Sequence, residues 1–325
     1  MRVLVTGGAG FIGSVTSRAL EAAGHDVAVF DDFSTGHDWA VGKGRVFRGD
    51  IRDITAVERA LRDFRAEGVL HFAAKAVVPE SVAHPGLYYD VNVVGSLRLL
   101  DAMRACGVKR IVFSSSAAVY GTPAASPITE DAPQFPINAY GRTKKHFEEI
   151  LEDERGATGI AYATLRYFNA CGAAPEWGLG EVREPETHLV PIVIRAAGGG
   201  EPVTVCGTDY PTRDGTCVRD YVDVRDLADA HVRALERLQP GGGSAWNLGT
   251  EVGTTVREVI AAVSRAVGRP VPFRDGPRRA GDPPVLVASC ARARRDLGWT
   301  PVRSLDESIR SVLEFVRSRG AKEGR

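Results

Sequence analysis

The sequence predicts an α/β fold, a doubly wound parallel sheet with a smaller C-terminal α/β lobe. Three observations carry this prediction. Residues 2–6 form a short β-branched run that leads straight into a glycine-rich turn and a helix pattern. Strand and helix patterns then alternate to about residue 170, the order typical of a parallel sheet. From residue 171 the alternation gives way to glycine- and proline-rich sequence, where we expect the second lobe to begin.

Length and composition indicate a two-part enzyme with a local binding site. The 325 residues exceed what one core usually organises, so we predict one domain over 1–170, with a return at 220–250, and a substrate lobe over 171–325. The formal net charge is zero, so neither nucleic acid nor a membrane surface is expected as a partner. Five widely spaced cysteines without a Cys-x-x-Cys pair favour reduced thiols in the cytoplasm and no metal site.

The first turn has the glycine spacing of a dinucleotide-binding site. Residues 7–14 read Gly-Gly-Ala-Gly-Phe-Ile-Gly-Ser and fit both Gly-x-Gly-x-x-Gly and Gly-x-x-Gly-x-x-Gly. Glycine lets the backbone approach a ligand closely, and the N-terminus of the next helix attracts a pyrophosphate. Taken alone, the same glycines are explained equally well by an ordinary tight turn.

The end of the second strand pattern, at residues 26–30, strengthens the nucleotide interpretation. Asp31 follows Gly13 by 18 residues, where a carboxylate is expected to hold a ribose, and Asp32 comes next. Two carboxylates would repel the extra phosphate of NADP, and no Arg or Lys lies between Asp31 and Lys43. The sequence therefore predicts NAD as the cofactor. The alternative is that both Asp residues simply close a strand.

Further strand patterns lie at 45–48, 69–72, 109–114 and 160–168, between helix patterns at 54–64, 88–105 and 138–154. The carboxyl ends of parallel strands share one edge of the sheet, where ligands bind. Ser114 to Ser116 end one strand. Tyr140 and Lys144 lie four apart on the next helix, so the ammonium can favour the phenolate and make Tyr140 an acid/base. Each signal is common alone, but together and in this order they favour a catalytic site.

These motifs together resemble the extended short-chain dehydrogenase/reductase superfamily and, within it, the UDP-hexose 4-epimerases. The likeness covers nearly the whole chain. It includes Asp-Asp-Phe-Ser-Thr-Gly at 31–36, His-Phe-Ala-Ala at 71–74, Leu-Arg-Tyr-Phe-Asn at 165–169, Glu-Thr-His-Leu-Val-Pro at 186–191 and Val-Arg-Asp-Tyr at 218–221.

The resemblance implies a Rossmann sheet and NAD-dependent inversion of C4 of a UDP-hexose, UDP-glucose or UDP-galactose. Hydride leaves C4 for tightly bound NAD while the hydroxyl proton goes to a protein base. The planar 4-keto intermediate then turns, and hydride returns to its other face. The resemblance also implies a homodimer built from the helices at 88–105 and 139–154.

The resemblance implies three sets of site residues, and no metal. The catalytic set is Ser116, Tyr140 and Lys144. The cofactor set comprises Gly7, Gly10, Phe11, Ile12, Asp31, Asp32, Asp50, Ile51, Phe72, Ala73, Ala74, Asn92, Ser114, Tyr140, Lys144 and Tyr167. The substrate set comprises Ser116, Tyr140, Asn169, His188, Leu189, Arg219, Arg279, Asp282 and Leu286, with Arg219 on the diphosphate.

Three alternatives stay open from the sequence. An epimerase for another UDP-sugar (UDP-GlcNAc, UDP-xylose/UDP-arabinose or UDP-glucuronate) would share the core motifs. The resemblance places Leu286, of intermediate size, at the position where a bulky residue excludes N-acetylated sugars. A nucleotide-sugar dehydratase needs acidic residues just after the rim serine, where Ala117 and Ala118 stand. A catalytically silent NAD-binding regulator has no physical need for the Tyr-Lys pair.

Overall fold

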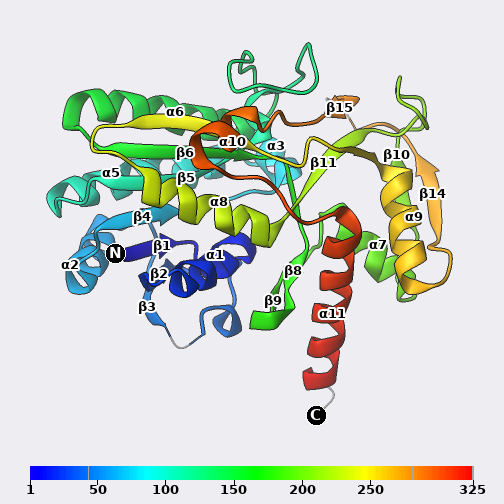
Figure 1. Ribbon diagram of the computed structural model, residues 1–325, viewed down its shortest axis with the longest axis horizontal. Helices are drawn as coiled ribbons and strands as arrows, with labels where there is room; N and C mark the ends of the chain where they lie inside the picture. The colour runs from blue at the N-terminus through cyan, green and yellow to red at the C-terminus, as the bar shows by residue number, and fades with distance from the viewer. Residues whose placement is uncertain (43, 280–281, 324–325) are drawn as a thin grey trace.

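The computed structural model describes residues 1–42, 44–279 and 282–323, and its larger part is a seven-stranded parallel sheet (Figure 1). Every neighbouring pair in the sheet runs parallel, in the order β12-β6-β5-β4-β1-β2-β3. The strands are β1 Arg2–Thr6, β2 Asp26–Asp31, β3 Arg45–Arg48, β4 Gly68–His71, β5 Arg110–Ser116, β6 Ala161–Tyr167 and β12 Gly243–Leu248. The predicted doubly wound fold class is confirmed.

Helices cover both faces of this sheet. One core cluster joins the sheet to α1 (Phe11–Ala22) and α8 (Val224–Arg237), which pack against each other. A second cluster on the opposite face joins it to α2 (Ile54–Phe64), α5 (Ser96–Ala105) and α6 (Ala139–Thr158). The central strands β1, β4 and β5 are therefore buried on both sides, which explains their nearly continuous apolar sequences.

One expected helix is broken. The pattern at 88–105 is divided into α4 (Pro85–Tyr89), a π-helical segment (Asp90–Gly95) and α5, after the short helix α3 (Val78–Ala83). Asn92 lies inside the π-helical segment, and its side chain binds the backbone of the loop after β4. The helix is therefore wider than an α-helix at the residue that makes this contact.

The C-terminal lobe is built around a small mixed sheet. Its strands are β7 Asn169–Cys171, β11 Val218–Asp223, β13 Gly253–Thr255 and β15 Val285–Leu286. Beside it lie the pairs β8 (Ala173–Ala174) with β9 (Leu179–Gly180) and β10 (Val203–Cys206) with β14 (Phe273–Gly276), and the helices α7 Leu189–Ala197, α9 Val256–Val267 and α11 Leu305–Glu323. The short helix α10 (Ala291–Leu297) packs instead against α8 and against β12 of the large sheet. Figure 1 shows α7, α9, β10 and β14 together at the right of the view. The domain boundary at residues 170 and 171 stays a prediction.

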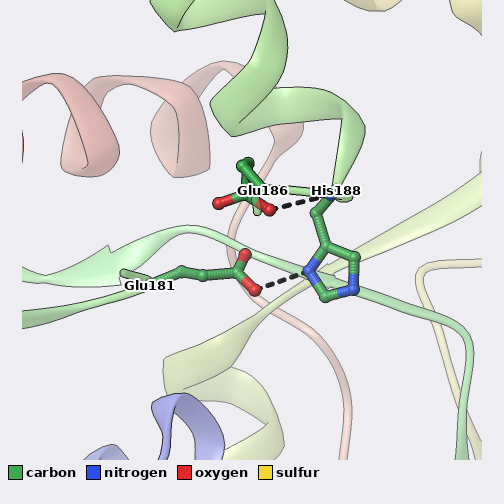
Figure 2. Close-up of side chains that lie close together, drawn as sticks. All are labelled: Glu181, Glu186 and His188. Atoms are coloured by element: carbon green, nitrogen blue, oxygen red, sulfur yellow. Dashed lines mark hydrogen bonds and ion pairs between the residues drawn. The ribbon is translucent and has the colours of Figure 1, made fainter. Parts of the chain in front are cut away.

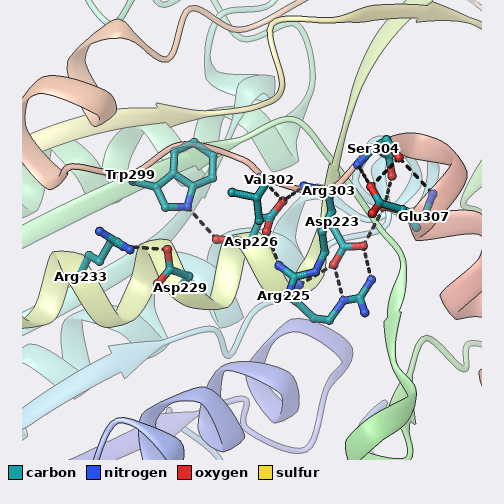
Figure 3. A network of polar contacts seen from close by, with 11 residues as sticks. Asp223, Arg225, Asp226, Asp229, Arg233, Trp299, Val302, Arg303, Ser304 and Glu307 are labelled. Atoms are coloured by element: carbon teal, nitrogen blue, oxygen red, sulfur yellow. Dashed lines mark hydrogen bonds and ion pairs between the residues drawn. The ribbon is translucent and has the colours of Figure 1, made fainter.

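Acidic side chains at the start of α8 attach the C-terminal segment (Figure 3). Asp223 is the N-cap of α8, and its carboxylate also accepts the hydroxyl proton of Ser308 at 2.7 Å. Asp226 accepts the backbone N–H of Arg303 at 3.0 Å, and its carbonyl accepts the Trp299 indole N–H at 2.9 Å. These bonds fix the chain before α11 against the large sheet. None of the helices within the described ranges combines the length and apolar character needed to span a bilayer.

Gly13 tests whether the first turn needs glycine for space. A Cβ there would lie 2.3 Å from the Gly7 carbonyl oxygen and 3.0 Å from Gly8 Cα, both backbone atoms. We therefore expect Gly13→Ala to lower the free energy of unfolding by about 1–3 kcal/mol, measured by urea denaturation. Gly156→Ala is the matched control: a Cβ on Gly156, in α6, meets nothing within 4 Å, so about 0.5–1 kcal/mol of stabilisation is expected. Equal effects of the two changes would contradict this reading of the turn.

Candidate active site

The glycine turn between β1 and α1 forms an open cradle that fits a dinucleotide. Gly7 has a φ of +72°, and a Cβ there would lie 2.5 Å from the Ala73 backbone nitrogen, so the turn sits directly against the end of β4. Gly10 is the N-cap of α1, and no side chain caps this helix. A Cβ on Gly10 would meet only the Gly7 carbonyl oxygen, at 3.4 Å. Backbone donors at the helix start thus face free space, as a pyrophosphate requires.

Asp31 ties this turn to β2. Its Oδ2 accepts the Ala9 N–H at 2.9 Å, and its Oδ1 accepts the Phe33 N–H at 2.8 Å. Burial raises the pKa of the carboxyl group, and these two backbone donors oppose that effect. Asp32 is exposed and accepts the Ser34 N–H at 2.9 Å. The spacing did not reveal this anchoring role of Asp31, and its contact with a ribose stays a prediction.

The other predicted cofactor segments follow β3 and β4. Asp50 comes after β3, and hydrogen bonds from Arg52 hold the pKa of its carboxyl below the usual range. Ile51 beside it is buried. After β4, the N–H groups of Phe72 and Ala73 donate to the Thr6 carbonyl at 2.9 and 3.1 Å. The glycine turn and the end of β4 are thereby joined by backbone bonds.

Asn92 is fully engaged by the protein. Its Oδ1 accepts the Lys75 N–H at 2.8 Å, and its Nδ2 donates to the Lys75 carbonyl at 3.0 Å and to Thr143 Oγ1 at 3.1 Å. The side chain therefore joins the π-helical segment to the loop after β4 and to α6. This orienting role was not visible in the sequence, where Asn92 was expected near the cofactor.

Lys144 is a buried ammonium at the centre of the catalytic set. Its side chain donates from Nζ to the Ser114 carbonyl at 2.8 Å and lies 4.8 Å from the centre of the Phe113 ring. Burial lowers the pKa of Lys144 to about 7, and the charge of Glu148 opposes this. The structure places Lys144 Nζ 5.8 Å from the centre of the Tyr140 ring.

Tyr140 and Ser116 complete this set. Tyr140 packs edge-to-face against Tyr88, with ring centres 6.5 Å apart. Burial raises the pKa of Tyr140, while the Ser116 hydroxyl and the positive charge of Arg183 favour the phenolate. Ser116 Oγ also accepts the Ala118 N–H at 3.2 Å. The three predicted catalytic side chains thus meet at the carboxyl end of β5.

The predicted substrate residues gather around β11. The Arg219 guanidinium pairs with the Asp282 carboxylate and donates to the Val218 carbonyl at 2.7 Å. Leu286 in β15 stands opposite Arg219 in register. Asn169 in β7 pairs with β11 and donates to the Asp220 carbonyl at 3.1 Å. Arg279 is exposed, and residues 280–281, between it and Asp282, lie outside the described ranges.

His188 is the N-cap of α7, which Leu189 begins, and Figure 2 shows it facing two glutamates. Its Nδ1 lies 2.7 Å from Glu181 Oε1, and its backbone N–H donates to Glu186 Oε1 at 2.8 Å. Ligand atoms of these three residues lie within 4.8 Å of one another. Arg183 Nη2 lies 3.8 Å from Glu181 Oε1, so His188 and Arg183 both face this carboxylate. Sequence reasoning missed both glutamates and Arg183.

His231, in α8, was also missed, because a single histidine inside a helix gives no motif. It is fully buried, and its Nδ1 donates to the Leu227 carbonyl at 2.7 Å. Its ring centre lies 4.7 Å from that of Phe72 and 6.0 Å from that of Tyr167, two predicted cofactor residues. The Tyr167 hydroxyl is hydrogen-bonded to Ser114 Oγ. His231 thus supports these two side chains from behind.

Comparison with known proteins gives a consistent result over both parts of the chain. Residues 3–249 match the NAD dependent epimerase/dehydratase family. A UDP-glucose 4-epimerase of Corynebacterium glutamicum is 47% identical over 316 residues, 97% of this chain and 94% of that protein. The crystal structure of UDP-glucose 4-epimerase from Brucella ovis in complex with NAD has a TM-score of 0.92 and 47% identity, covering 95% of this chain and 96% of that one. The crystal structure of UDP-glucose 4-epimerase from Bifidobacterium longum in complex with NAD+ and UDP has a TM-score of 0.94 and 40% identity, covering 98% of this chain and 99% of that one.

His231 makes the stability of the protein sensitive to acid. Burial lowers its pKa to about 4, below the ordinary value of 6.5, so its contribution is complete above pH 6.5 and is lost as the pH falls towards 4. Between pH 7 and pH 4.5 the free energy of unfolding of the wild type should fall by more than that of His231→Phe, with a difference of about 1–3 kcal/mol. Urea denaturation at each pH measures both. His84→Gln, at an exposed position, should leave the pH dependence unchanged. An identical acid dependence in wild type and His231→Phe would contradict the assignment.

Proposed function

The chain belongs to the NAD dependent epimerase/dehydratase family, and we infer that it inverts C4 of a UDP-hexose, interconverting UDP-glucose and UDP-galactose. The observation that carries this is the meeting of Ser116, Tyr140 and Lys144 at the end of β5, on the sheet edge that also holds the glycine cradle. A sugar C4–H is not acidic, so abstraction of a proton cannot invert this carbon. Bound NAD supplies a hydride acceptor that can return the hydride to either face of a 4-keto sugar.

The proton chemistry belongs to Tyr140. Its hydroxyl oxygen takes the proton of the sugar 4-hydroxyl and later returns it, while Ser116 donates a hydrogen bond to the same sugar oxygen. Because burial raises the pKa of Tyr140, a nearby positive charge is needed for the phenolate to form at neutral pH. Lys144 supplies part of that charge from the same face of α6, and bound NAD would add to it.

The cofactor contacts are proposed for the residues around the cradle. Gly7 and Gly10 leave room for the pyrophosphate, and Asp31 stands at the end of β2 where the adenosine ribose is expected. Phe72, Ala73 and Ala74, after β4, lie against the same turn. Ser114 and Tyr167, beside Lys144, are proposed for the nicotinamide end.

Binding of UDP is proposed for the C-terminal lobe. Arg219 is paired with Asp282, so a diphosphate would exchange one anionic partner of the guanidinium for another. His188 and Leu189 stand at the start of α7, where the helix dipole also favours an anion. Contacts with UDP supply binding energy remote from C4 and leave the hexose free to turn.

The first test is conversion of UDP-galactose to UDP-glucose by the purified protein without added cofactor. We expect activity in the wild type and a loss of at least about 100-fold in Tyr140→Phe, because the acid/base is removed. Tyr89→Phe, whose ring packs on His146 in α6, is the matched control and should stay active.

Wild-type rates in Tyr140→Phe would refute the role of this phenol. If the wild type converts nothing even with added NAD, the substrate is another UDP-sugar or the protein is silent, and UDP-GlcNAc, UDP-xylose and UDP-glucuronate would be assayed next.

Two copies of the chain are proposed to associate through the helical stretches at 88–105 and 139–154. Val94 and Leu97 in the first stretch have exposed apolar side chains, and so do Val82 and Leu87 just before it. Light scattering at micromolar concentration should therefore give twice the 34.8 kDa of one chain. Leu97→Glu should shift the mass towards the monomer, whereas Val302→Glu, at an exposed position in the C-terminal segment, should not. A monomeric wild type would overturn the proposal.

A cytoplasmic location is proposed on the chemistry of the thiols. The five cysteines are free, and three of them are buried. Burial raises the pKa of Cys171 and Cys290, which keeps both as unreactive thiols. Free thiols in this number are typical of a reducing compartment.

A further inference from the structure

A buried carboxylate lies directly behind the catalytic set and takes no part in the reaction described above. Glu148 is 8% exposed and lies on α6 one helical turn after Lys144. Its Oε1 accepts the Ser115 hydroxyl proton at 2.5 Å, and its Oε2 accepts Arg166 Nη2 at 2.6 Å. Gln134 Nε2 adds a further bond at 3.2 Å. A buried carboxylate is costly unless fully paired, and this one is paired from three elements of the structure.

Arg166 fixes the orientation of this carboxylate. It lies in β6 and donates from Nε to both oxygens of Glu148 at 3.1 Å. Its Nη1 donates to the Tyr120 hydroxyl oxygen at 2.9 Å and to the Glu130 carbonyl at 3.1 Å. The Tyr120 hydroxyl in turn donates to Asn247 Oδ1, in β12, at 2.7 Å. The guanidinium therefore has partners on every side, and the ion pair has one well-defined geometry.

The charges around Lys144 make Glu148 important for the site. His71, facing from β4, is neutral because burial and the ammonium lower its pKa to about 3. Tyr140 is on the same helix, and Arg166, on β6, is paired with Glu148. The Glu148 carboxylate raises the pKa of Lys144 against the opposite effect of burial. Lys144 itself is 4% exposed, so water cannot supply this compensation.

We propose that Glu148 is a positioning residue of the active site, whose carboxylate supports the charge of Lys144 and holds the serine end of β5 in place. Lys144 and Glu148 bind adjacent residues of β5. Lys144 donates to the Ser114 carbonyl, and Glu148 accepts the Ser115 hydroxyl proton. The next residue along the strand is Ser116, beside Tyr140. This inference rests on the proposed function in one point, that Tyr140 is the base and that Lys144 supports its ionisation.

The sign of the effect follows from the charges. Without the carboxylate, Lys144 loses its proton at a lower pH, and the positive charge beside Tyr140 is lost within the neutral range. A loss of packing alone would change stability without moving this ionisation. The pH at which Lys144 loses its proton therefore separates positioning from a merely structural role.

The experiment compares Glu148→Gln with Glu149→Gln, the same substitution at the next, exposed residue of α6. Ionisation of Lys144 is followed in the purified protein by NMR of carbon-13-labelled lysine side chains, with the Lys144 signal identified by its absence from Lys144→Met. We expect the midpoint to fall by about one pH unit in Glu148→Gln and to stay unchanged in Glu149→Gln. In the epimerase assay, kcat at neutral pH should fall about tenfold while KM stays within about twofold.

An unchanged midpoint in folded Glu148→Gln would overturn the proposal. If that variant does not fold because Arg166 is left unpaired, the double variant Glu148→Gln with Arg166→Met removes both charges and should show a Lys144 midpoint lowered in the same direction. Failure of the proposed function is distinguishable: a protein without epimerase activity would still show the lowered Lys144 midpoint in Glu148→Gln.

Discussion

The buried ammonium of Lys144 is the constraint on which the rest of the active site depends. A cation with 4% exposure has lost most of its water and must be compensated by fixed groups. The Ser114 carbonyl, the face of the Phe113 ring and the Glu148 carboxylate do this, and all lie on β5 or α6. The positions of β5 and α6 are therefore set by charge compensation as well as by apolar packing. Tyr140, on the same helix, takes its place from this arrangement.

A second buried charge relates the C-terminal lobe to the large sheet. Asp220, in β11, is fully buried and accepts the N–H groups of Thr250 and Ala288 at 2.7 and 3.1 Å. These partners lie in the segments after β12 and after β15. Asn169 follows β6 closely and pairs with β11. Strand β11 is therefore fixed by two segments that leave the large sheet, one after β6 and one after β12. Arg219, one residue before Asp220, is thereby held in a constant position relative to the sheet.

The sequence predicted the features that local chemistry determines. The glycine spacing, the acidic strand end and the Tyr-Lys pair each occupy a few neighbouring residues, and with the resemblance they led to the confirmed fold class, cofactor and reaction. The contacts that orient these features were not predicted, because they join distant residues. Asn92 reaches Thr143 through a π-helical segment that no periodicity indicates, and Arg166 reaches Glu148 between different elements. The assignment of individual site residues to cofactor and substrate stays a prediction.

The electrostatics of Tyr140 link acid/base chemistry to occupation of the cradle. Burial raises the pKa of this phenol. Within the protein, the Ser116 hydroxyl and the positive charge of Arg183 oppose this effect. Lys144 is itself only partly protonated at physiological pH, since burial lowers its pKa to about 7. A phenolate therefore forms readily only when further positive charge lies nearby, and the oxidised nicotinamide carries such a charge. If Tyr140 is the acid/base, as proposed, its phenolate would be populated in the state in which a hydride acceptor is bound, and this would couple proton removal from the sugar to hydride transfer.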